Sequence, residues 1–317
     1  MNRAARPIAA IDIGSNSVHL TLARVSDGDI EVIERRKDPA QLAGQLERDG
    51  RLSDRAVDRV VATLRDFAQV AKAHDAVVRA TATAAVRAAR NGQTFLDRAE
   101  REAGVDVELI SGAQEARLTY QGVMHGLPEL RDSAVLAVDI GGGSTELVCG
   151  RDGRAALTAS VATGSLVVSR TLLGPDPISR HRIDRARRRL EATLAHRMRD
   201  VERVGFEIAV ATGGTAQRLA RLAQALDGEV RADVHRAFLS RLALDTVVKR
   251  LARAPTRAER LAIRGMDPER VDTVLGGALV FQVLTRGLGI EGWTVSMDAL
   301  RTGLLVDTHR READRAD

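Results

Sequence analysis

The chain has 317 residues, of which 44% are hydrophobic and 29% charged. This length predicts two domains of ordinary size, and the composition excludes a disordered, collagen-like or membrane-bundle protein. Five Phe, one Trp and one Tyr are few for this length, which argues against a surface that stacks nucleic-acid bases.

The net charge of +5 is modest, and it favours a polyanionic partner without requiring one. Lysine occurs only at Lys37, Lys72 and Lys249, so the basic residues are almost all arginine; an arginine-preferring genome accounts for this most simply. The single Cys149 excludes internal disulfides and cysteine zinc sites. The first apolar run, residues 8–11, is too short for a signal or membrane segment. We therefore expect a cytoplasmic protein with neither a membrane nor a specific nucleic-acid partner.

The first predicted element is a β-hairpin. An apolar run ends in Asp12, passes through the tip Gly14, Ser15, Asn16 and Ser17, and resumes as an apolar strand. Apolar periodicity then predicts strands at residues 20–25, 30–34 and 76–80 and helices at 53–73, 83–89, 94–103 and 112–124.

The same hairpin pattern recurs 127 residues later, which indicates a duplicated domain. Here the apolar run ends in Asp139, and the tip contains Gly141, Gly142, Gly143, Ser144 and Thr145. Strands follow at 147–149, 155–162, 208–211 and 293–296, and helices at 183–201, 215–226, 242–252, 268–288 and 300–306, with a frayed, charged tail at 307–317. We predict an α/β protein with domains at 1–128 and 129–317, the final helix packing back on the first domain.

Glycine-rich tips expose consecutive backbone NH groups, which form concave sites for phosphate oxygens. The two tips therefore predict two phosphate loops, with side-chain donors from Asn16, Ser144 and Thr145; the alternative is an ordinary hairpin turn at each. Asp12 and Asp139 are suited to hold a hard cation such as Mg²⁺ or Mn²⁺. Glu146 is either a third metal ligand or a solvated strand residue.

A third glycine motif, at residues 211–216, lies between an apolar strand and a helix. Gly213 and Gly214 would then begin a helix whose NH groups and positive dipole end attract an anion. The alternative is a tight strand-to-helix turn. Together the three loops are expected to line a cleft between the domains.

Three motifs make a family resemblance specific. Residues 82–91, 110–120 and 139–146 closely resemble the exopolyphosphatase and guanosine pentaphosphate phosphohydrolase family. That family lies within the superfamily of actin, sugar kinases and heat-shock-chaperone ATPases. The resemblance implies two duplicated ribonuclease H-like (actin-like ATPase) domains with an interdomain cleft, and partner packing that commonly completes such clefts, so a homodimer is one expectation.

The resemblance also implies roles for single residues. Glu115 matches the catalytic carboxylate, which Asp139 accompanies, and Arg87 matches an arginine that approaches substrate phosphate. Ser165 falls where relatives have a small residue facing the phosphate. From the residues alone, Ser111 and Gln114 form a capping box that puts Glu115 in the first turn of a helix, where the dipole favours an acid in any case.

The chain departs from the family pattern at Gln114, at Met297, at Thr302 and in residues 37–44, and its only His-Asp pair, His74-Asp75, is interpreted as a loop pair. The resemblance implies a magnesium-dependent hydrolase that removes the terminal phosphate of inorganic polyphosphate. Three alternatives stay open: the same chemistry on the guanosine alarmones pppGpp and ppGpp, a sensing protein that binds these ligands without turnover, and a kinase of the superfamily. The lone cysteine argues against the kinase, because short sugar kinases usually carry a cysteine-rich zinc motif.

Overall fold

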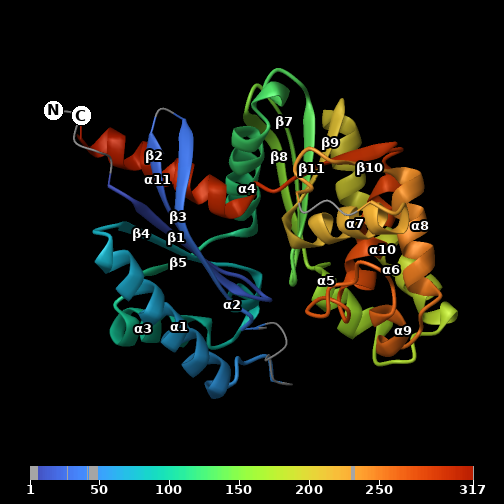
Figure 1. Ribbon diagram of the computed structural model, residues 1–317, viewed down its shortest axis with the longest axis horizontal. Helices are drawn as coiled ribbons and strands as arrows, with labels where there is room; N and C mark the ends of the chain where they lie inside the picture. The colour runs from blue at the N-terminus through green and yellow to red at the C-terminus, as the bar shows by residue number, and fades with distance from the viewer. Residues whose placement is uncertain (1–5, 27, 41, 43–48, 230–232, 317) are drawn as a thin grey trace. The chain divides into compact units, whose positions relative to one another are not determined.

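The computed structural model describes all residues except 1–5, 27, 41, 43–48, 230–232 and 317. It divides the chain into two units (Figure 1). Unit 1 comprises Met1–His125 and Leu300–Asp317, and unit 2 comprises Gly126–Ala299. Part of the 37–44 segment, which departs from the family pattern, lies outside the described residues.

Unit 1 is built on a five-stranded sheet in the order β3-β2-β1-β4-β5. β1 runs antiparallel to β2, and β2 to β3, whereas β4 is parallel to β1 and β5 to β4. The strands are β1 (Ile8–Ile13), β2 (Val18–Ser26), β3 (Asp29–Asp38), β4 (Val77–Ala82) and β5 (Val107–Leu109).

Helices cover both faces of this sheet, because β1 is apolar on both sides. Ala9 and Ile11 belong to the core formed with α1 and α3, whereas Ile8 and Ala10 belong to a second core that contains Leu304 of α11. The helices of unit 1 are α1 (Asp54–Ala73), α2 (Ala84–Ala88), α3 (Gly92–Ala103), α4 (Gly112–Gly126) and α11 (Leu300–Ala316).

Unit 2 repeats the arrangement, with the sheet order β10-β11-β9-β6-β7-β8. β6, β7 and β8 form antiparallel pairs, and β9 and β11 are parallel to β6 and to each other. The strands are β6 (Val135–Ile140), β7 (Thr145–Arg151), β8 (Arg154–Val161), β9 (Ile208–Thr212), β10 (Phe238–Ser240) and β11 (Gly292–Ser296). The predicted duplicated α/β fold is confirmed.

The helices of unit 2 pack around α10 (Val274–Gly287), whose residues are buried along most of its length. Phe281 of α10 meets Trp293 edge to face, with ring centroids 5.3 Å apart. The other helices are η2 (Pro128–Leu130), α5 (Ser165–Val168), the π-helical turn η3 (Ser169–Leu173), α6 (Arg180–Val204), α7 (Gly213–Leu226), α8 (Arg241–Ala252) and α9 (Arg257–Leu261).

The structure corrects two predicted helices. Residues 268–273 form turns, so α10 begins at Val274 and not at Pro268. Residues 307–316 continue α11 instead of fraying, because Thr308 is buried and Arg311 pairs with Asp307 at i,i+4, 2.8 Å apart. The short elements β5, β10, α5, η3 and α9 were not predicted, since each spans too few residues to show a period.

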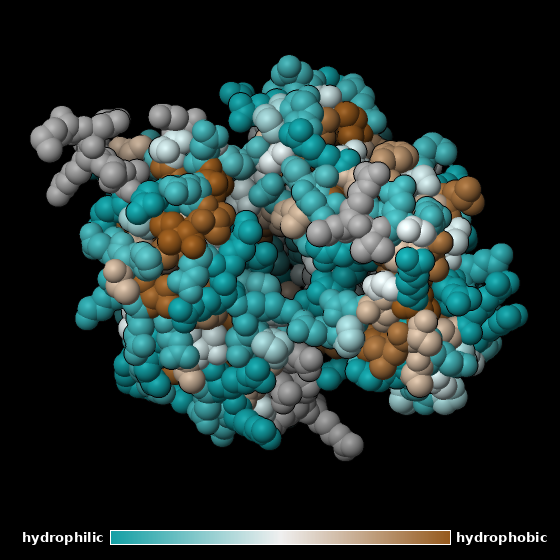
Figure 2. Space-filling model, viewed as in Figure 1, coloured by the Kyte–Doolittle hydropathy of each residue, from teal (hydrophilic) through white to brown (hydrophobic). Residues whose placement is uncertain are grey.

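The surface visible in Figure 2 is mainly hydrophilic, with apolar residues in separate groups. Phe238 and Leu242 are the most exposed large apolar side chains among the described residues, at 67% and 77%. None of the described helices combines the length and apolar character that crossing a membrane requires.

Candidate phosphate-binding and catalytic site

The first hairpin tip is a tight turn between β1 and β2. The Gly14 amide donates to the Ser17 carbonyl at 3.1 Å, which closes the turn and leaves Ser15 and Asn16 at its end. A Cβ on Gly14 would lie only 3.2 Å from that carbonyl oxygen, so the tight closure favours glycine. Ser15 and Ser17 are buried, and Asn16 is half-buried. The predicted hairpin is confirmed.

Asp12 stands at the base of this tip with an unsatisfied oxygen. Its Oδ1 is buried and has no hydrogen-bond partner within the described structure, and its Oδ2 lies 4.0 Å from the Arg301 guanidinium. Burial raises the pKa of Asp12 to about 6, although Arg301 opposes the shift. A buried acceptor without a donor is costly unless a cation meets it. Asp12 therefore fits the predicted role of a ligand to a hard cation.

Glu115 and Arg87 form an ion pair within unit 1. The Ser111 and Gln114 capping box is confirmed: the Ser111 amide donates to Gln114 Oε1 at 2.8 Å, and the Gln114 amide to Ser111 Oγ at 3.2 Å. This cap places Glu115 in the first turn of α4, with its side chain 11% exposed. Arg87 Nη1 lies 3.2 Å from Glu115 Oε2 and donates to the Ile110 carbonyl at 2.8 Å.

The same region of unit 1 includes the end of β1. The Thr83 amide and hydroxyl both donate to the Ile13 carbonyl, at 3.2 and 3.4 Å. Thr83 precedes α2, which carries Arg87, so this contact ties the arginine's helix to the first tip. Arg87 is 28% exposed in its side chain and is thus partly buried and paired, not a free surface arginine.

The second tip closes in the same way but is fixed by a helix. The Gly141 amide donates to the Ser144 carbonyl at 3.0 Å. The carbonyls of Gly141, Gly142 and Gly143 accept bonds from the amides of residues 164–167 around the start of α5. In a planar trans peptide the NH points opposite to the C=O. The amides of Gly142, Gly143 and Ser144 therefore point away from α5, as an anion-binding nest requires.

Two predicted site residues of this region, Ser165 and Thr145, use their hydroxyls inside the protein. The Ser165 hydroxyl donates to the Gly141 carbonyl at 3.0 Å, and the Thr145 hydroxyl donates to the Thr163 carbonyl at 3.1 Å. Thr145 is fully buried. These hydroxyls hold the second tip in shape, so the prediction of a Thr145 side-chain donor to phosphate is corrected.

Asp139 lies where the second and third glycine motifs meet. It pairs in register with Glu146 on β7 and with Thr212 on β9. Residues directly opposite in an antiparallel pair share one face of the sheet, so the Asp139 and Glu146 side chains project to the same side. Glu146 is 2% exposed and accepts a bond from Ser160 Oγ at 2.8 Å, so its interpretation as a solvated strand residue is wrong.

The third glycine motif begins α7 directly after β9, as predicted. Gly213 has φ +79°, and a Cβ there would overlap the Asp139 carboxylate. Glycine is thus required both by the backbone conformation and by the close approach of Asp139. The Thr215 hydroxyl donates to the Ile140 carbonyl at 2.7 Å, which fastens the first turn of α7 to β6.

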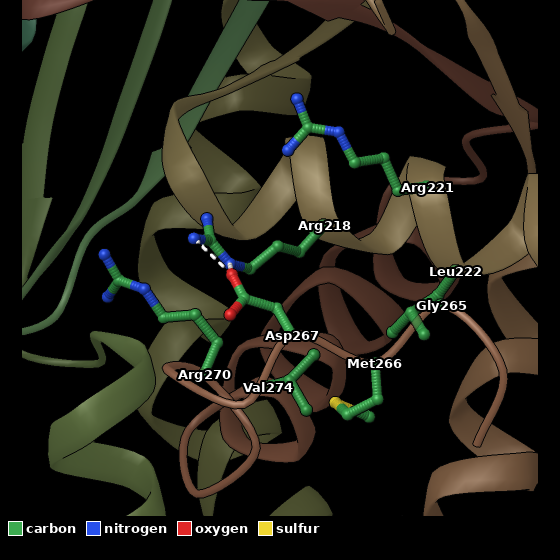
Figure 3. Close-up of a pocket in the computed structure, with 8 residues that line it drawn as sticks. All are labelled: Arg218, Arg221, Leu222, Gly265, Met266, Asp267, Arg270 and Val274. Atoms are coloured by element: carbon green, nitrogen blue, oxygen red, sulfur yellow. Dashed lines mark hydrogen bonds and ion pairs between the residues drawn. The ribbon is translucent and has the colours of Figure 1, made fainter. Parts of the chain in front are cut away.

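Two arginines gather beside this turn. Arg218 of α7 pairs with Asp267 at 2.6 Å, and Arg270 lies beside the pair, whereas Arg221 points away from it (Figure 3). Burial and the like charge of Arg218 lower the pKa of Arg270 to about 10. Arg218 and Arg270 also line an adjoining hollow together with Ser165, Gly214 and Thr215. The hollow thus presents two guanidiniums, which suit an anion, while Asp267 and Glu269 offset part of the charge of Arg270.

Comparison with known proteins decides the family. The sequence profile of the Ppx/GppA phosphatase family matches residues 21–312. The chain belongs to the Ppx/GppA phosphatase family. It is 32% identical over 312 residues to exopolyphosphatase 1 of Mycobacterium tuberculosis, an alignment that covers 97% of this chain and 89% of the relative.

Solved structures of Ppx/GppA relatives agree with this assignment. An exopolyphosphatase from Cytophaga hutchinsonii superposes with a TM-score of 0.87 at 28% identity, covering 96% of this chain and 98% of that one. The Ppx/GppA enzyme of Aquifex aeolicus gives a TM-score of 0.81 at 29% identity, covering 95% and 99%. The resemblance inferred from the three motifs is confirmed.

The predicted site residues fall into two sets. Unit 1 holds Asp12, the first tip, Arg87 and Glu115, and unit 2 holds Asp139, the second tip, Glu146, Ser165, Gly213 and Gly214. Their roles towards substrate and metal stay predictions. Within the described ranges, no three His, Cys, Asp or Glu side chains cluster in a way that would hold a metal ion.

Sequence reasoning missed Arg218, Asp267 and Arg270. Arg218 carried a usable signal, because it follows Gly214 by four residues and so lies one helical turn beyond a predicted anion-binding start. Arg270 carried none, because the contact between the two arginines' segments joins residues about fifty positions apart in a chain that is rich in arginine.

Proposed function

We propose that this protein is an exopolyphosphatase, a phosphoanhydride hydrolase that releases orthophosphate from the end of inorganic polyphosphate. The observation that carries the proposal is the partly buried ion pair in unit 1, in which Arg87 Nη1 lies 3.2 Å from Glu115 Oε2. The helix of Arg87 is tied to the end of β1 at the first tip, and unit 2 repeats this glycine-containing hairpin. Curated relatives that are 32% identical over nearly the whole chain are named exopolyphosphatases.

Glu115 supplies the base of the proposed reaction. A carboxylate that orients the attacking water and accepts its proton contributes about 10²- to 10⁴-fold to a rate. Arg87 pairs with this carboxylate, and its guanidinium has further NH groups that can approach a phosphate oxygen. The Ile110 carbonyl fixes the arginine at 2.8 Å, so the pair is positioned before substrate arrives.

The backbone of the second tip binds phosphate oxygens in this proposal. The amides of Gly142, Gly143 and Ser144 share one direction because the carbonyls before them are bonded to the start of α5. The start of α7, with Gly213 and Gly214, adds further amides and the positive end of a helix dipole. Donors fixed before the reaction stabilise developing charge without reorganisation.

Arg218 and Arg270 extend this anion site along unit 2. They line one hollow with Gly214 and Thr215, so a phosphate held by the α7 start lies beside two guanidiniums. We assign them to the phosphate groups that follow the terminal one, since these remain charged throughout the reaction.

The metal in this proposal is Mg²⁺ or Mn²⁺. Asp12 fits such a cation best, because its buried Oδ1 has no other partner among the described residues. Asp139 and Glu146 are the corresponding acids of unit 2. Magnesium typically keeps several waters and needs one or two carboxylates, so a closed set of three protein ligands is not required. When bound, the ion neutralises phosphate charge.

The test is orthophosphate release from long-chain polyphosphate and from guanosine pentaphosphate, each with and without Mg²⁺. We expect magnesium-dependent release from polyphosphate, and we expect Glu115→Gln to slow it by about 10²- to 10⁴-fold. A strong preference for guanosine pentaphosphate in direct competition would replace the proposed substrate with the alarmone. Tight binding of polyphosphate without release in Mg²⁺ or Mn²⁺ would replace the enzyme with a sensing protein.

A further inference from the structure

Helix α6 carries a concentration of positive charge that the proposed reaction does not use. Its 25 residues contain nine arginines and four acidic residues, an excess equal to the +5 of the whole chain. An arginine-preferring genome does not account for this, because the rest of the chain is then balanced. The charge is confined to one element of unit 2.

Five of the nine arginines also lie on one face of α6. The buried residues Ile183, Ala186, Leu190, Leu194 and Val201 form the side that packs on the core. At 3.6 residues per turn, the opposite side carries a row that we call the basic stripe. The basic stripe consists of Arg185, Arg188, Arg189, His196, Arg199 and Arg203.

Most of the basic stripe is exposed and lacks protein counterions. Arg185, Arg188, Arg189 and Arg199 are exposed, and no ion pair is found for them in the part of the chain that the structure describes. The other two members of the stripe, His196 and Arg203, each lie 3.6 Å from Asp200. Beside the stripe, Arg187 pairs with Asp184 at 2.9 Å and Arg197 with Asp200 at 3.1 Å. From Arg185 to Arg203 the stripe extends about 27 Å along the helix.

The stripe begins near the phosphate-binding end of unit 2. Gly276 in α10 packs against Ser165 and Ser169, close to the second tip, and Gln282 of α10 accepts a bond from Arg187 at 3.0 Å. Six residues of helix separate Gly276 from Gln282, which is about 9 Å along α10. Further along, Gly287 packs against Met198, so α6 and α10 run in the same general direction.

We propose that the basic stripe is a docking surface for the polyphosphate chain beyond the phosphates bound at the second tip. This inference rests on the proposed function. Polyphosphate is a flexible linear polyanion that repeats one charged group, so a row of uncompensated guanidiniums complements it without any specific register. The stripe makes the enzyme prefer long chains, because only these extend from the tip to α6.

The experiment compares two triple variants with the same change in charge. Arg185→Gln/Arg188→Gln/Arg189→Gln removes the near half of the stripe. Lys249→Gln/Arg250→Gln/Arg253→Gln removes three exposed cations at the end of α8 in the same unit. All six side chains are exposed, so both proteins should fold, and circular dichroism melting checks this. kcat/KM is measured on polyphosphate of several hundred phosphates and on tripolyphosphate.

We expect the α6 variant to lose at least about tenfold in kcat/KM on the long chain and to keep its activity on tripolyphosphate within about twofold. A plot of log kcat/KM against log salt concentration has a negative slope on the long chain. In the α6 variant this slope should be less negative by about 2 to 3, as expected when three phosphate contacts are lost. In the α8 variant, kcat/KM should change by no more than about twofold on either substrate.

Three results would overturn the inference: equal behaviour of the two variants, a parallel loss on both substrates, or lost binding to duplex DNA or anionic vesicles with unchanged binding to polyphosphate. Failure of the proposed function gives a different result, since the wild type would then release no orthophosphate from either chain length.

Discussion

The two hairpin tips share one backbone design and differ in what surrounds them. Each closes with an amide-to-carbonyl bond, from Gly14 to Ser17 in unit 1 and from Gly141 to Ser144 in unit 2. In unit 1 the neighbourhood supplies acids, with the unsatisfied Asp12 and the paired Glu115. In unit 2 the acids are Asp139 and Glu146, and the neighbourhood also supplies aligned amides and two arginines. The duplicated sheet therefore positions both tips, and the helices that follow its strands supply the side chains in which the two sites differ.

The comparison extends to one arginine–carboxylate pair in each unit. Arg87 on α2 pairs with Glu115, and Arg218 on α7 pairs with Asp267. Arg87 follows β4, which is parallel to β1, and Arg218 follows β9, which is parallel to β6. In unit 1 the carboxylate is the better buried partner, whereas in unit 2 a second arginine, Arg270, lies beside the pair and its pKa is lowered by burial and by Arg218. The carboxylate is thus the chemically distinctive member of the unit 1 pair, and the guanidinium is that of the unit 2 pair.

Removing the acid of unit 1 should give the largest effect. Glu115→Gln keeps the shape of the side chain and loses the proton acceptor, so we expect kcat on polyphosphate to fall by about 10²- to 10⁴-fold. The dissociation constant for polyphosphate should change by less than about threefold. Stopped-time orthophosphate assays and a direct binding titration measure the two, with the exposed Glu100→Gln as control. Full activity of Glu115→Gln would contradict the assignment of Glu115 as the base.

Asp12 should make the metal-free protein less stable as pH rises. Its folded pKa of about 6 exceeds the ordinary 3.8, so the folded state binds more protons between these values and unfolding releases them. Stability then falls by up to about 3 kcal/mol from pH 4 to pH 6 and stays level above that. Urea unfolding without divalent ions measures this slope.

Asp12→Asn serves as the matched variant for that slope. It should remove this part of the pH dependence and leave the protein more stable at pH 7 than the wild type. Added Mg²⁺ should stabilise the wild type at pH 7 but not the variant. Identical pH slopes for the two proteins would contradict the assignment of an uncompensated carboxylate at the first tip.

The glycines of the two motifs in unit 2 should differ in tolerance. Gly213→Ala places a Cβ on a residue with φ +79° and against the Asp139 carboxylate, so we expect a loss of about 1–3 kcal/mol in stability and a large loss of activity. Gly141→Ala meets only ordinary contact, 3.6 Å from the Ser144 carbonyl oxygen, and should cost less than about 0.5 kcal/mol. Equal unfolding midpoints would show that the third motif relaxes away from Asp139.

Arg270→Gln should have the smallest effect, and it should act on binding. A charge-assisted hydrogen bond contributes about 1.5–3 kcal/mol, so KM for polyphosphate should rise about tenfold or more with kcat within about twofold. The melting temperature should stay unchanged or rise, because a partly desolvated cation beside Arg218 is removed. Arg264→Gln, an exposed neighbour, is the control. A fall in kcat with constant KM would place Arg270 in the chemical step.

The sequence predicted those features that depend on neighbouring residues. Alternating apolar runs ending in Asp12 and Asp139 identified both hairpins, and the Ser111–Gln114 pair identified the start of α4. Gly213 was identified because a glycine between an apolar strand and a helix is typical of a tight turn at the helix start. Each of these signals lies within a few residues of the structure that it predicts.

What the sequence did not show depends on contacts between distant segments. Arg218 meets Asp267 across 49 positions, and no local pattern distinguishes these residues from many other charged ones. For the same reason, the sequence did not predict the hydrogen bond from the Ser165 hydroxyl to the Gly141 carbonyl, 24 positions away. The charged end of α11 was misjudged because burial of Thr308 depends on the sheet and not on neighbouring residues.

The path of α11 determines when unit 1 can be completed. Leu300, Leu304 and Leu305 cover the face of the sheet formed by Ile8 and its neighbours, and Gly303 lets the α11 backbone approach that of Leu118. These residues are translated after the whole of unit 2, whereas the sheet that they cover is translated before it. Unit 2 is one continuous stretch of chain. During synthesis, unit 2 therefore has its whole sequence available while the strands of unit 1 still expose an apolar face, and chaperone binding at that stage should target unit 1.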